Sequence, residues 1–199
     1  MIALAIICSG GALTYAKVIR PHVVPKNFGV VEEGKLYRAG ELTAAATRKV
    51  VEERHVKTII DLGAYSDSPV EERIARQTAE ALGVERRVFR LEGDGTGNPN
   101  AYVEALRIIT DPSKQPVLVH CSAGSQRTSA CVLLYREILQ GKPIPTQMDE
   151  AYAHGHDPKK NTRMKPYLEQ WHEKIAAALR AGTLIDGQPR AEVDPPARP

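Results

Sequence analysis

The sequence has few of the residues that mark several protein classes. Its 199 residues include three cysteines, one tryptophan and two phenylalanines. The cysteines, Cys8, Cys121 and Cys131, are odd in number and lack paired or metal-ligand spacing, which argues against a disulfide framework and a zinc knuckle and favours a reducing compartment. The net charge of +3 lacks the concentrated positive charge of a nucleic-acid-binding protein, so we expect no nucleic-acid partner.

The apolar run at the N-terminus, residues 2–16, is shorter than the roughly 20 residues of a membrane-spanning helix. Its length is typical of a signal-peptide core or an interfacial anchor, and a buried first strand or helix is the alternative. Lys17 and Arg20 follow the run and no basic residue precedes it, a bias that would leave the domain on the cytoplasmic side of a membrane. We therefore expect residues 1–20 to be an apolar segment that associates with a membrane, with export by a signal peptide as the alternative.

The remainder has the composition of one globular α/β domain. Residues from Asn27 onward alternate short β-type runs with amphipathic helical segments, which predicts a sheet covered by helices. The predicted strands cover residues 35–38, 57–62, 84–91 and 116–120. The predicted helices cover residues 69–82, 99–110, 128–139 and 166–181. The four prolines of residues 183–199 predict a flexible, solvated tail.

Two of these helices allow predictions about individual side chains. The first begins with a capping box of Ser68 and Glu71 around Pro69, and its apolar face is expected to include Val70 and Ile74. The third carries Cys131 at helical spacing with other apolar residues. Cys131 is therefore predicted to be a core residue rather than a catalytic one.

The segment between the strand at residues 116–120 and the helix that Arg127 begins has the features of an anion-binding loop. It reads Cys121-Ser122-Ala123-Gly124-Ser125-Gln126. A loop of this length at a helix N-terminus points its N–H groups inward, and the helix dipole adds positive potential, which suits a tetrahedral dianion. Gly124 lets the backbone turn, and Arg127 can supply two parallel donors. Residues 122–127 are thus the predicted phosphate-binding residues.

A cysteine beside such a loop is favoured as the thiolate. Free cysteine titrates near 8.5, and helix N-termini or cations lower this to roughly 3.5–7.5. Cys121 is therefore the predicted nucleophile, and Thr128 could donate its hydroxyl to the sulfur when it leaves. The alternative, a buried small hydrophobe, is disfavoured because Gly124, Arg127 and Thr128 follow Cys121 at a spacing that would rarely arise by chance.

The run His120-Cys121-Ser122-Ala123-Gly124-Ser125-Gln126-Arg127-Thr128 resembles the signature of the cysteine-dependent protein tyrosine and dual-specificity phosphatases. Residues 34–40 and 56–62 resemble the opening of compact atypical dual-specificity phosphatases, including the bacterial group related to domains fused to NAD kinase. The resemblance covers residues 27–139. It implies a protein tyrosine phosphatase-like α/β fold, with a short, mostly parallel central sheet flanked by helices, in a domain at residues 27–182.

The resemblance also implies a general acid, an aspartate on a mobile loop some tens of residues before the cysteine. Asp94 fits best, because it lies in a stretch with three glycines that could permit loop closure. The alternative is an aspartate in a turn before the next helix. Glu92 is the reserve acid. Asp111 has the sequence context of a turn residue, and Asp61 that of a residue that braces the loop.

The resemblance gives His120 a supporting role in orienting the loop, although a buried histidine satisfied by backbone groups would give the same sequence. The chemistry requires no metal and no other cofactor. His154 and His156 share one loop with Asp157 and are expected to be solvent-exposed rather than metal ligands. Arg163, with the lysines around it, is expected to be solvated surface.

The sequence departs from the family's pattern in two places, the Ser125-Gln126 pair and Ser129, and these departures bear on the substrate. Ser125 and Gln126 stand where the family often has glycine, lysine, aspartate or histidine, and Ser129 stands where it usually has glycine. The loop also lacks the lysine common in inositol-phosphate phosphatases. We therefore expect a phosphomonoesterase with a cysteinyl-phosphate intermediate, acting on phosphotyrosine, and on phosphoserine or phosphothreonine, in proteins. The alternatives are a phosphatase of inositol phosphates or another small phosphoester, a non-catalytic phospho-binding module, and a rhodanese-type sulfur transferase.

Overall fold

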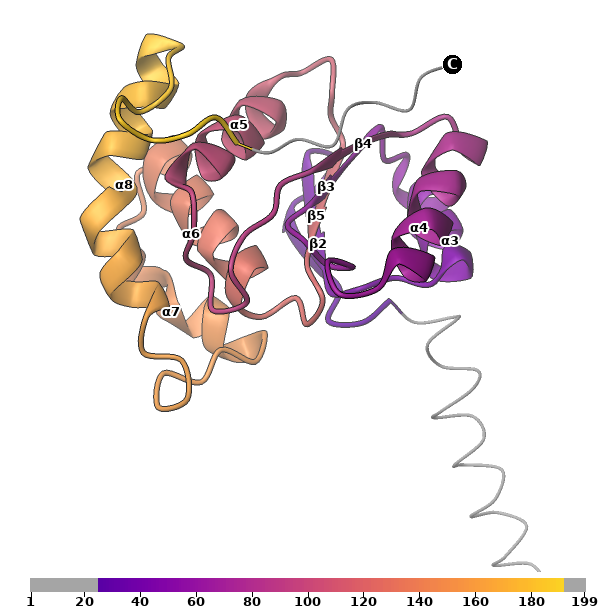
Figure 1. Ribbon diagram of the computed structural model, residues 1–199, viewed down its shortest axis with the longest axis horizontal. Helices are drawn as coiled ribbons and strands as arrows, with labels where there is room; N and C mark the ends of the chain where they lie inside the picture. The colour runs from indigo at the N-terminus through magenta and orange to yellow at the C-terminus, as the bar shows by residue number, and fades with distance from the viewer. Residues whose placement is uncertain (1–24, 192–199) are drawn as a thin grey trace, which may run out of the picture.

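The computed structural model describes residues 25–191, which form a sheet of five short strands between two layers of helices (Figure 1). The strands lie in the order β1-β2-β5-β3-β4, with β1 antiparallel to β2 and the other pairs parallel. Their bounds are Gly29–Glu32 (β1), Leu36–Ala39 (β2), Thr58–Asp61 (β3), Glu85–Val88 (β4) and Val117–His120 (β5). The predicted α/β class with a short, mostly parallel sheet is confirmed.

The helices divide between the two faces of the sheet. In Figure 1, α3 and α4 cover one face, and α5, α6, α7 and α8 gather on the other. Their bounds are Ala44–Arg54 (α3), Pro69–Ala81 (α4), Pro99–Thr110 (α5), Gln126–Gln140 (α6), Ile144–Ala153 (α7) and Met164–Ala181 (α8). Alternate strand residues enter two cores, because successive side chains of a strand point to opposite faces. Ile59 packs in the α3 core and Ile60 in the α5–α6 core.

The predicted strands and helices all occur, with ends shifted by a few residues. The patterns above do not indicate β1, α3 or α7. Among the residues of α3 only Ala46, Thr47 and Val50 are buried, so the helix lacks a strong apolar stripe. α7 begins beside two prolines, which suit the first turn of a helix but suggest extended chain when seen in sequence alone.

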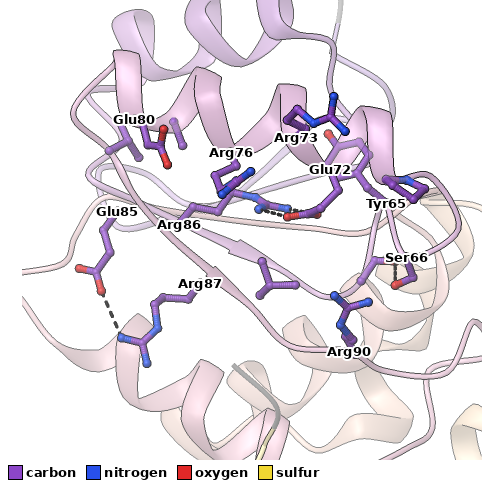
Figure 2. Close-up of a pocket in the computed structure, with 15 residues that line it drawn as sticks. Tyr65, Ser66, Glu72, Arg73, Arg76, Glu80, Glu85, Arg86, Arg87 and Arg90 are labelled. Atoms are coloured by element: carbon purple, nitrogen blue, oxygen red, sulfur yellow. Dashed lines mark hydrogen bonds and ion pairs between the residues drawn. The ribbon is translucent and has the colours of Figure 1, made fainter. Parts of the chain in front are cut away.

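The apolar face expected for α4 is wrong. Val70 is 57% exposed and Ile74 is 38% exposed, whereas the buried residues of α4 are Thr78 and Ala79. Only the C-terminal half of this helix therefore packs closely. A cavity of about 750 Å³ lies between α4 and β4 (Figure 2). Half of the predicted capping box forms: the Ser68 hydroxyl accepts a hydrogen bond from the Glu71 N–H at 3.4 Å, but the Ser68 N–H donates to the Tyr65 carbonyl at 3.0 Å and not to the Glu71 side chain.

The structure also differs from the predicted solvated tail, over residues 183–191. These residues lie against the start of α5, where the Asn100 side chain accepts from the Ile185 N–H at 2.8 Å and donates to the Pro189 carbonyl at 2.9 Å. Leu184 and Ile185 are partly buried against the main core. Composition alone does not reveal these contacts, because they depend on an asparagine some 85 positions earlier in the chain.

The apolar N-terminal segment at residues 1–20 lies outside the described residues, so its association with a membrane stays a prediction. Within residues 25–191, no helix combines the length and the apolarity needed to cross a membrane.

Candidate active site

The predicted phosphate-binding loop lies where three parallel strands end side by side. His120 at the end of β5 pairs with Ala39 of β2 on one side and with Asp61 of β3 on the other. The loops that follow parallel strands converge at this edge of a sheet, which is where ligands bind in such folds. Residues 121–125 form the loop, and α6 begins at Gln126.

The loop turns its carbonyl oxygens outward. Three consecutive carbonyls accept hydrogen bonds from outside the loop: Ser122 from the Glu41 N–H at 3.0 Å, Ala123 from the Asn27 amide at 3.2 Å and Gly124 from the Arg38 guanidinium at 2.8 Å. In a trans peptide unit the N–H points away from the C=O, so the N–H groups of residues 123–125 point inward. The Gly124 N–H accordingly donates to the Cys121 Sγ at 3.3 Å.

The first turn of α6 adds further donors to the same place. Ser125 occupies the N-cap position, but its side chain makes no capping hydrogen bond. The N–H groups of a helix's first turn have no partner inside the helix, and they carry the positive end of the helix dipole. An anion at this position would therefore meet both the inward loop amides and the helix N-terminus.

Close backbone packing fixes the shape of the loop. Gly124 has a φ of +74°, and a Cβ there would lie 2.7 Å from the Gly40 nitrogen. A Cβ on Gly40 would in turn lie 2.9 Å from the Ala123 carbonyl oxygen. Both positions require glycine because the end of β2 touches the loop without room for a side chain. Gly40 therefore helps to shape the loop, although it lies 81 positions before Cys121 in the chain.

The two cysteines in the described part of the chain have different surroundings. Cys121 lies within the loop, 2% exposed, with the Gly124 N–H directed at its sulfur. Cys131 is wholly buried in α6, and burial raises the pKa of its thiol to about 12. The predicted core role of Cys131 is confirmed. Of the two cysteines, only Cys121 lies at the cradle, the ring of inward N–H groups of residues 122–126.

Arg127 is held at the rim of the cradle by backbone carbonyls. Its Nη1 donates to the Leu62 carbonyl at 3.0 Å and also to the Gly63 carbonyl. Its Nη2 donates to the Ser122 hydroxyl at 3.1 Å, and that hydroxyl donates to the Ala64 carbonyl at 2.6 Å. The Arg127 Nε is buried without a partner among the described residues. A buried donor of this kind is costly unless a ligand satisfies it.

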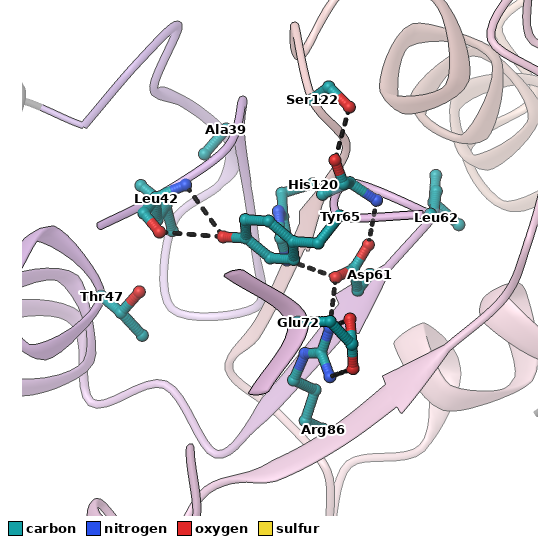
Figure 3. A network of polar contacts seen from close by, with 12 residues as sticks. Ala39, Leu42, Thr47, Asp61, Leu62, Tyr65, Glu72, Arg86, His120 and Ser122 are labelled. Atoms are coloured by element: carbon teal, nitrogen blue, oxygen red, sulfur yellow. Dashed lines mark hydrogen bonds and ion pairs between the residues drawn. The ribbon is translucent and has the colours of Figure 1, made fainter. Parts of the chain in front are cut away.

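His120 and Asp61 lie side by side at the ends of β5 and β3, where the loop begins (Figure 3). The His120 Nε2 lies 3.6 Å from the Asp61 Oδ2. Asp61 also accepts from the Ala64 N–H at 2.5 Å and from Arg86 at 2.6 Å. Burial lowers the pKa of His120, although the Asp61 charge opposes the shift, so the imidazole is neutral at pH 7. Asp61 thus occupies the bracing position that its place at a strand end suggested.

Asp94 lies in a tight loop beside the start of α6. A Cβ on Gly95 would lie 3.3 Å from the Gln126 backbone, so the segment that carries Asp94 touches the helix N-terminus. Asp94 accepts from the Thr96 N–H at 3.0 Å and from the Thr96 hydroxyl at 2.6 Å, and it pairs with Arg163 at 3.0 Å. Burial raises the pKa of Asp94, but the Thr96 hydrogen bonds and the Arg163 charge outweigh burial and lower it.

The other acidic candidates lie differently. Asp111 is a turn residue at the end of α5 and accepts from the Ser113 N–H at 2.8 Å. It precedes β5, whereas the loop follows β5, so the two lie at opposite ends of this strand. Glu92 is exposed in the same turn as Asp94 and accepts the Gly95 N–H at 2.9 Å through its backbone carbonyl.

The Thr128 hydroxyl does not point to the sulfur as expected. It donates to the Ala39 carbonyl at 3.5 Å, a long hydrogen bond, and Thr128 is fully buried. The hydrogen bond that Cys121 accepts comes instead from the Gly124 N–H. The donor to the sulfur is a backbone N–H, so the residue types in the sequence could not identify it.

The two unusual loop residues have partners in the segment after α7. The Ser125 hydroxyl donates to the His154 carbonyl at 2.8 Å, and the Gln126 Oε1 lies 2.5 Å from the His156 Nδ1. His156 is therefore buried, not solvent-exposed as expected. Burial lowers the pKa of His156, so a neutral ring that donates from Nδ1 to the amide oxygen fits this contact.

Arg38 supports the loop from within the protein, a position that its sequence context did not indicate. It is almost fully buried behind the loop, where its Nη2 donates to the Gly124 carbonyl and to the Ser129 hydroxyl, both at 2.8 Å. Burial lowers the pKa of Arg38 to about 10, so it remains a cation at neutral pH. Ser129, the second departure from the family pattern, thus supplies an acceptor for this arginine. A substrate-recognition role for Arg38 does not fit its position.

His154 and His156 do not form part of a metal site among the described residues. Over residues 25–191, no three histidine, cysteine, aspartate or glutamate side chains come together as a metal site would require. His154 and His156 contact the backbone and side chains of the loop region instead.

The chain matches a family of phosphatases along most of its length. Residues 15–167 match the family model described as "DSP-PTPase phosphatase fused to NAD+ Kinase". The chain belongs to this family. Among curated proteins it is 28% identical over 122 residues to inositol diphosphatase DSP1 of Oryza sativa subsp. japonica. That match covers 58% of this chain and 51% of the relative, so the chain spans about half the relative's length.

Solved structures share the fold of this family member. The core catalytic domain of the PP-IP phosphatase Siw14 from S. cerevisiae, in complex with citrate, superimposes with a TM-score of 0.61 at 22% identity, covering 81% of this chain and 98% of that chain. TpbA from P. aeruginosa in complex with pTyr gives a TM-score of 0.62 at 19% identity, covering 77% and 90%. The protein tyrosine phosphatase-like fold is thereby confirmed, and the chain is a member of the dual-specificity phosphatase-like hydrolases.

Proposed function

We propose that this protein hydrolyses phosphomonoesters through a phosphocysteine formed on Cys121. The proposal rests on one observation, the inward orientation of the N–H groups of residues 123–125 around the Cys121 sulfur. These donors suit the three non-bridging oxygens of a phosphate group whose phosphorus lies in front of the sulfur. Ser122, Ala123, Gly124, Ser125 and Gln126 provide the cradle, and Arg127 contributes its unpartnered Nε.

In the first step, the Cys121 thiolate attacks phosphorus opposite the leaving oxygen. The S–P bond forms as the P–O bond to the leaving group breaks, and Asp94 donates a proton to that oxygen. The loop amides and Arg127 stabilise the negative charge of the transferring group. Asp94 must turn from Arg163 toward the substrate for this step, a motion that the neighbouring glycines permit.

In the second step, water attacks the phosphocysteine. The ionised Asp94 accepts a proton from the water, the new P–O bond forms, and the S–P bond breaks to regenerate the thiolate. The Thr128 hydroxyl stabilises the departing sulfur after leaving its long hydrogen bond to Ala39. Inorganic phosphate is the product, and Asp94 is protonated again for the next cycle.

We infer phosphotyrosine as the first substrate, with phosphoserine and phosphothreonine in proteins as further ones. Cys121 is only 2% exposed, so a substrate must extend its phosphate to the floor of the cradle, and the long tyrosine side chain does so best. The binding of pTyr by TpbA, a protein of the same fold, supports this choice. Inositol phosphates are the second candidate, because the curated relative is named an inositol diphosphatase.

The test uses two aryl phosphates that differ in how much their leaving group needs a proton. We expect Cys121→Ser to abolish hydrolysis of both para-nitrophenyl phosphate and phenyl phosphate. Asp94→Asn should lower kcat on phenyl phosphate by about 10²- to 10⁴-fold, the usual contribution of a general acid, and should affect para-nitrophenyl phosphate less. Steady-state rates of the full chain provide the measurement.

Two controls separate this proposal from a binding module. Rapid quenching of the wild type should trap a phosphoenzyme that Cys121→Ser does not form. Tight binding of a phosphopeptide without any phosphoenzyme would favour the binding module instead. Equal activity of the wild type and both variants would remove the assignment altogether.

A further inference from the structure

The cavity between α4 and β4 (Figure 2) has no residue of the phosphate-binding loop in its lining, so it is separate from the cradle around Cys121. α4 contributes Arg73 and Arg76 to one wall, and Arg90, which follows β4, lies across from them. Gly63 and Ser66 also line the cavity. The lining includes five arginines and three glutamates, so the cavity has an excess of positive charge.

Most of the acidic charge in this cavity is already paired. Glu72 pairs with Arg86 at 2.7 Å, and Arg86 also pairs with Asp61 at 2.6 Å. Glu85 pairs with Lys114 at 2.6 Å and with Arg87 at 3.4 Å. Arg73 and Arg76 lie outside these pairs.

Arg73 and Arg76 carry much of that excess. Both are exposed, and their guanidinium groups have no hydrogen bond or ion pair with another residue of the described chain. Both lie on α4 three positions apart, so they are neighbours on one side of the helix. The planar fork of a guanidinium matches the oxygens of a phosphate group with two parallel hydrogen bonds.

Gly63 connects this cavity to the phosphate cradle. Its carbonyl accepts a hydrogen bond from Arg127, the arginine of the cradle, while the residue itself lines the cavity. The Arg90 backbone is also close, since a Cβ on Gly63 would lie 3.6 Å from the Arg90 Cα. A single residue thus separates the arginine that faces the reacting phosphate from the cavity.

We propose that this cavity binds a second phosphate group of the substrate through Arg73, Arg76 and Arg90, while the first phosphate lies over Cys121. The proposal rests on the proposed phosphatase function and names the class of substrate that the enzyme prefers, one with more than one phosphate group. The second phosphate is not hydrolysed in this position. It holds the substrate, and its arginine contacts lower KM and raise kcat/KM.

The experiment compares the full-length wild type with the double variant Arg73→Ala/Arg76→Ala. The substrates are para-nitrophenyl phosphate, inositol hexakisphosphate, and one peptide in singly and doubly phosphorylated forms. We expect the double variant to lose about tenfold or more in kcat/KM on substrates with several phosphates, as hydrogen bonds to charged groups predict. Its rate on para-nitrophenyl phosphate should stay within about twofold of the wild type.

The control variant Arg48→Ala/Arg180→Ala removes two exposed arginines elsewhere on the surface. It should retain the preference for several phosphates, because a loss caused by net charge alone would affect both variants equally. Loss confined to inositol hexakisphosphate assigns the site to small polyphosphates, and loss confined to the doubly phosphorylated peptide assigns it to phosphoproteins. A wild type without such a preference, or equal losses on all substrates or in both variants, would overturn the proposal.

A binding measurement keeps this outcome independent of turnover. Cys121→Ser protein, with and without the Arg73→Ala/Arg76→Ala pair, is titrated with inositol hexakisphosphate and the doubly phosphorylated peptide by calorimetry. We expect the arginine changes to weaken binding of at least one of them about tenfold. If catalysis by Cys121 failed but this difference remained, the site would stand without the proposed chemistry. If catalysis held but both ligands bound equally well to the two proteins, the site would be refuted alone.

Discussion

Arg127 shows how a single side chain is prepared for an anion before any anion binds. Two backbone carbonyls hold its Nη1, and the Ser122 hydroxyl holds its Nη2. A guanidinium fixed in this way loses little conformational entropy when the phosphate arrives. Its Nε has no partner among the described residues, a feature that it shares with Arg38, Arg86 and Arg87. What sets Arg127 apart is its place in the first turn of α6, directly after the loop.

Asp94 is the residue whose surroundings make the sharpest prediction about pH. The Arg163 charge is one cause of the lowered pKa of Asp94, so Arg163→Ala should raise that pKa. A general acid works only while protonated, and the alkaline limb of the kcat/KM–pH profile, which reports pKa values of the free enzyme, should therefore move to higher pH. Arg163 is exposed, so solvent screens the pair to about 0–1 kcal/mol, and we expect a shift of roughly half a pH unit. Rates on phenyl phosphate between pH 4 and pH 8 measure it.

Lys165→Ala is the matched control for this prediction. Lys165 is an exposed cation two residues further along the chain and pairs with Glu169 instead of Asp94. Its removal should leave the alkaline limb in place. A limb that stays fixed in Arg163→Ala, or moves to lower pH, would mean that Asp94 is not the titrating acid.

At the scale of elements, the strand, loop and helix that carry Cys121 could be predicted because their signals are local. The buried run of β5, the glycine in the loop and the arginine at the start of α6 lie within a dozen residues. The partners that hold the outside of the loop could not be predicted. Asn27 lies 96 positions before Ala123, and His156 lies 30 positions after Gln126. Such contacts follow from how β1 and α7 pack, and neither element has a strong pattern.

The contact between Gln126 and His156 predicts coupling between α6 and the segment after α7. Gln126→Ala and His156→Ala should each lower kcat/KM several-fold, because each loses the same hydrogen bond beside Arg127. The double variant should be no worse than either single variant. The interaction energy should thus be about 0.5–1.5 kcal/mol in a double-mutant cycle. The alkylation rate of Cys121 by iodoacetate gives a second readout, one that a general loss of stability would not move.

Lys160→Ala provides the control for this cycle. Its side chain lies in the same connecting segment and is 86% exposed, so neither kcat/KM nor the alkylation rate should change. Additive effects of the two single variants would show that the Gln126–His156 contact does not position the loop.

Across the whole molecule, the two cores meet at the sheet, and the active site lies at one edge of both. The Asp61–Arg86–Glu72 network joins β3, β4 and α4 to the floor of the loop. The site therefore depends on the assembled fold and not on the loop alone. His120 is a buried titratable group beside this network, so the stability of the fold is expected to depend on pH.

His120 predicts that the protein loses stability in mild acid. Its pKa is lowered by burial in the folded state, so below about pH 6.5 the unfolded chain binds a proton that the folded chain does not. The free energy of unfolding should therefore fall with decreasing pH, by at most about 1.4 kcal/mol per pH unit from this group. Urea unfolding of wild type and His120→Asn at pH 7.5 and pH 5.5 checks this.

For each protein, the free energy of unfolding at pH 5.5 is compared with that at pH 7.5, because His120→Asn also changes packing at both pH values. The wild type should lose about 1 kcal/mol more than the variant between the two conditions. Equal losses would indicate that His120 is protonated in the folded protein, in conflict with its buried position.

The edges of the described sheet have a consequence for the protein at high concentration. β4 forms one edge, and three of its four residues, Glu85, Arg86 and Arg87, are charged. β1 forms the other edge, and its register with β2 is irregular between Val30 and Glu32. Charged and irregular edges prevent a further strand from adding to a sheet. The apolar strands β3 and β5 are thereby shielded from fibre-like aggregation between copies of the chain.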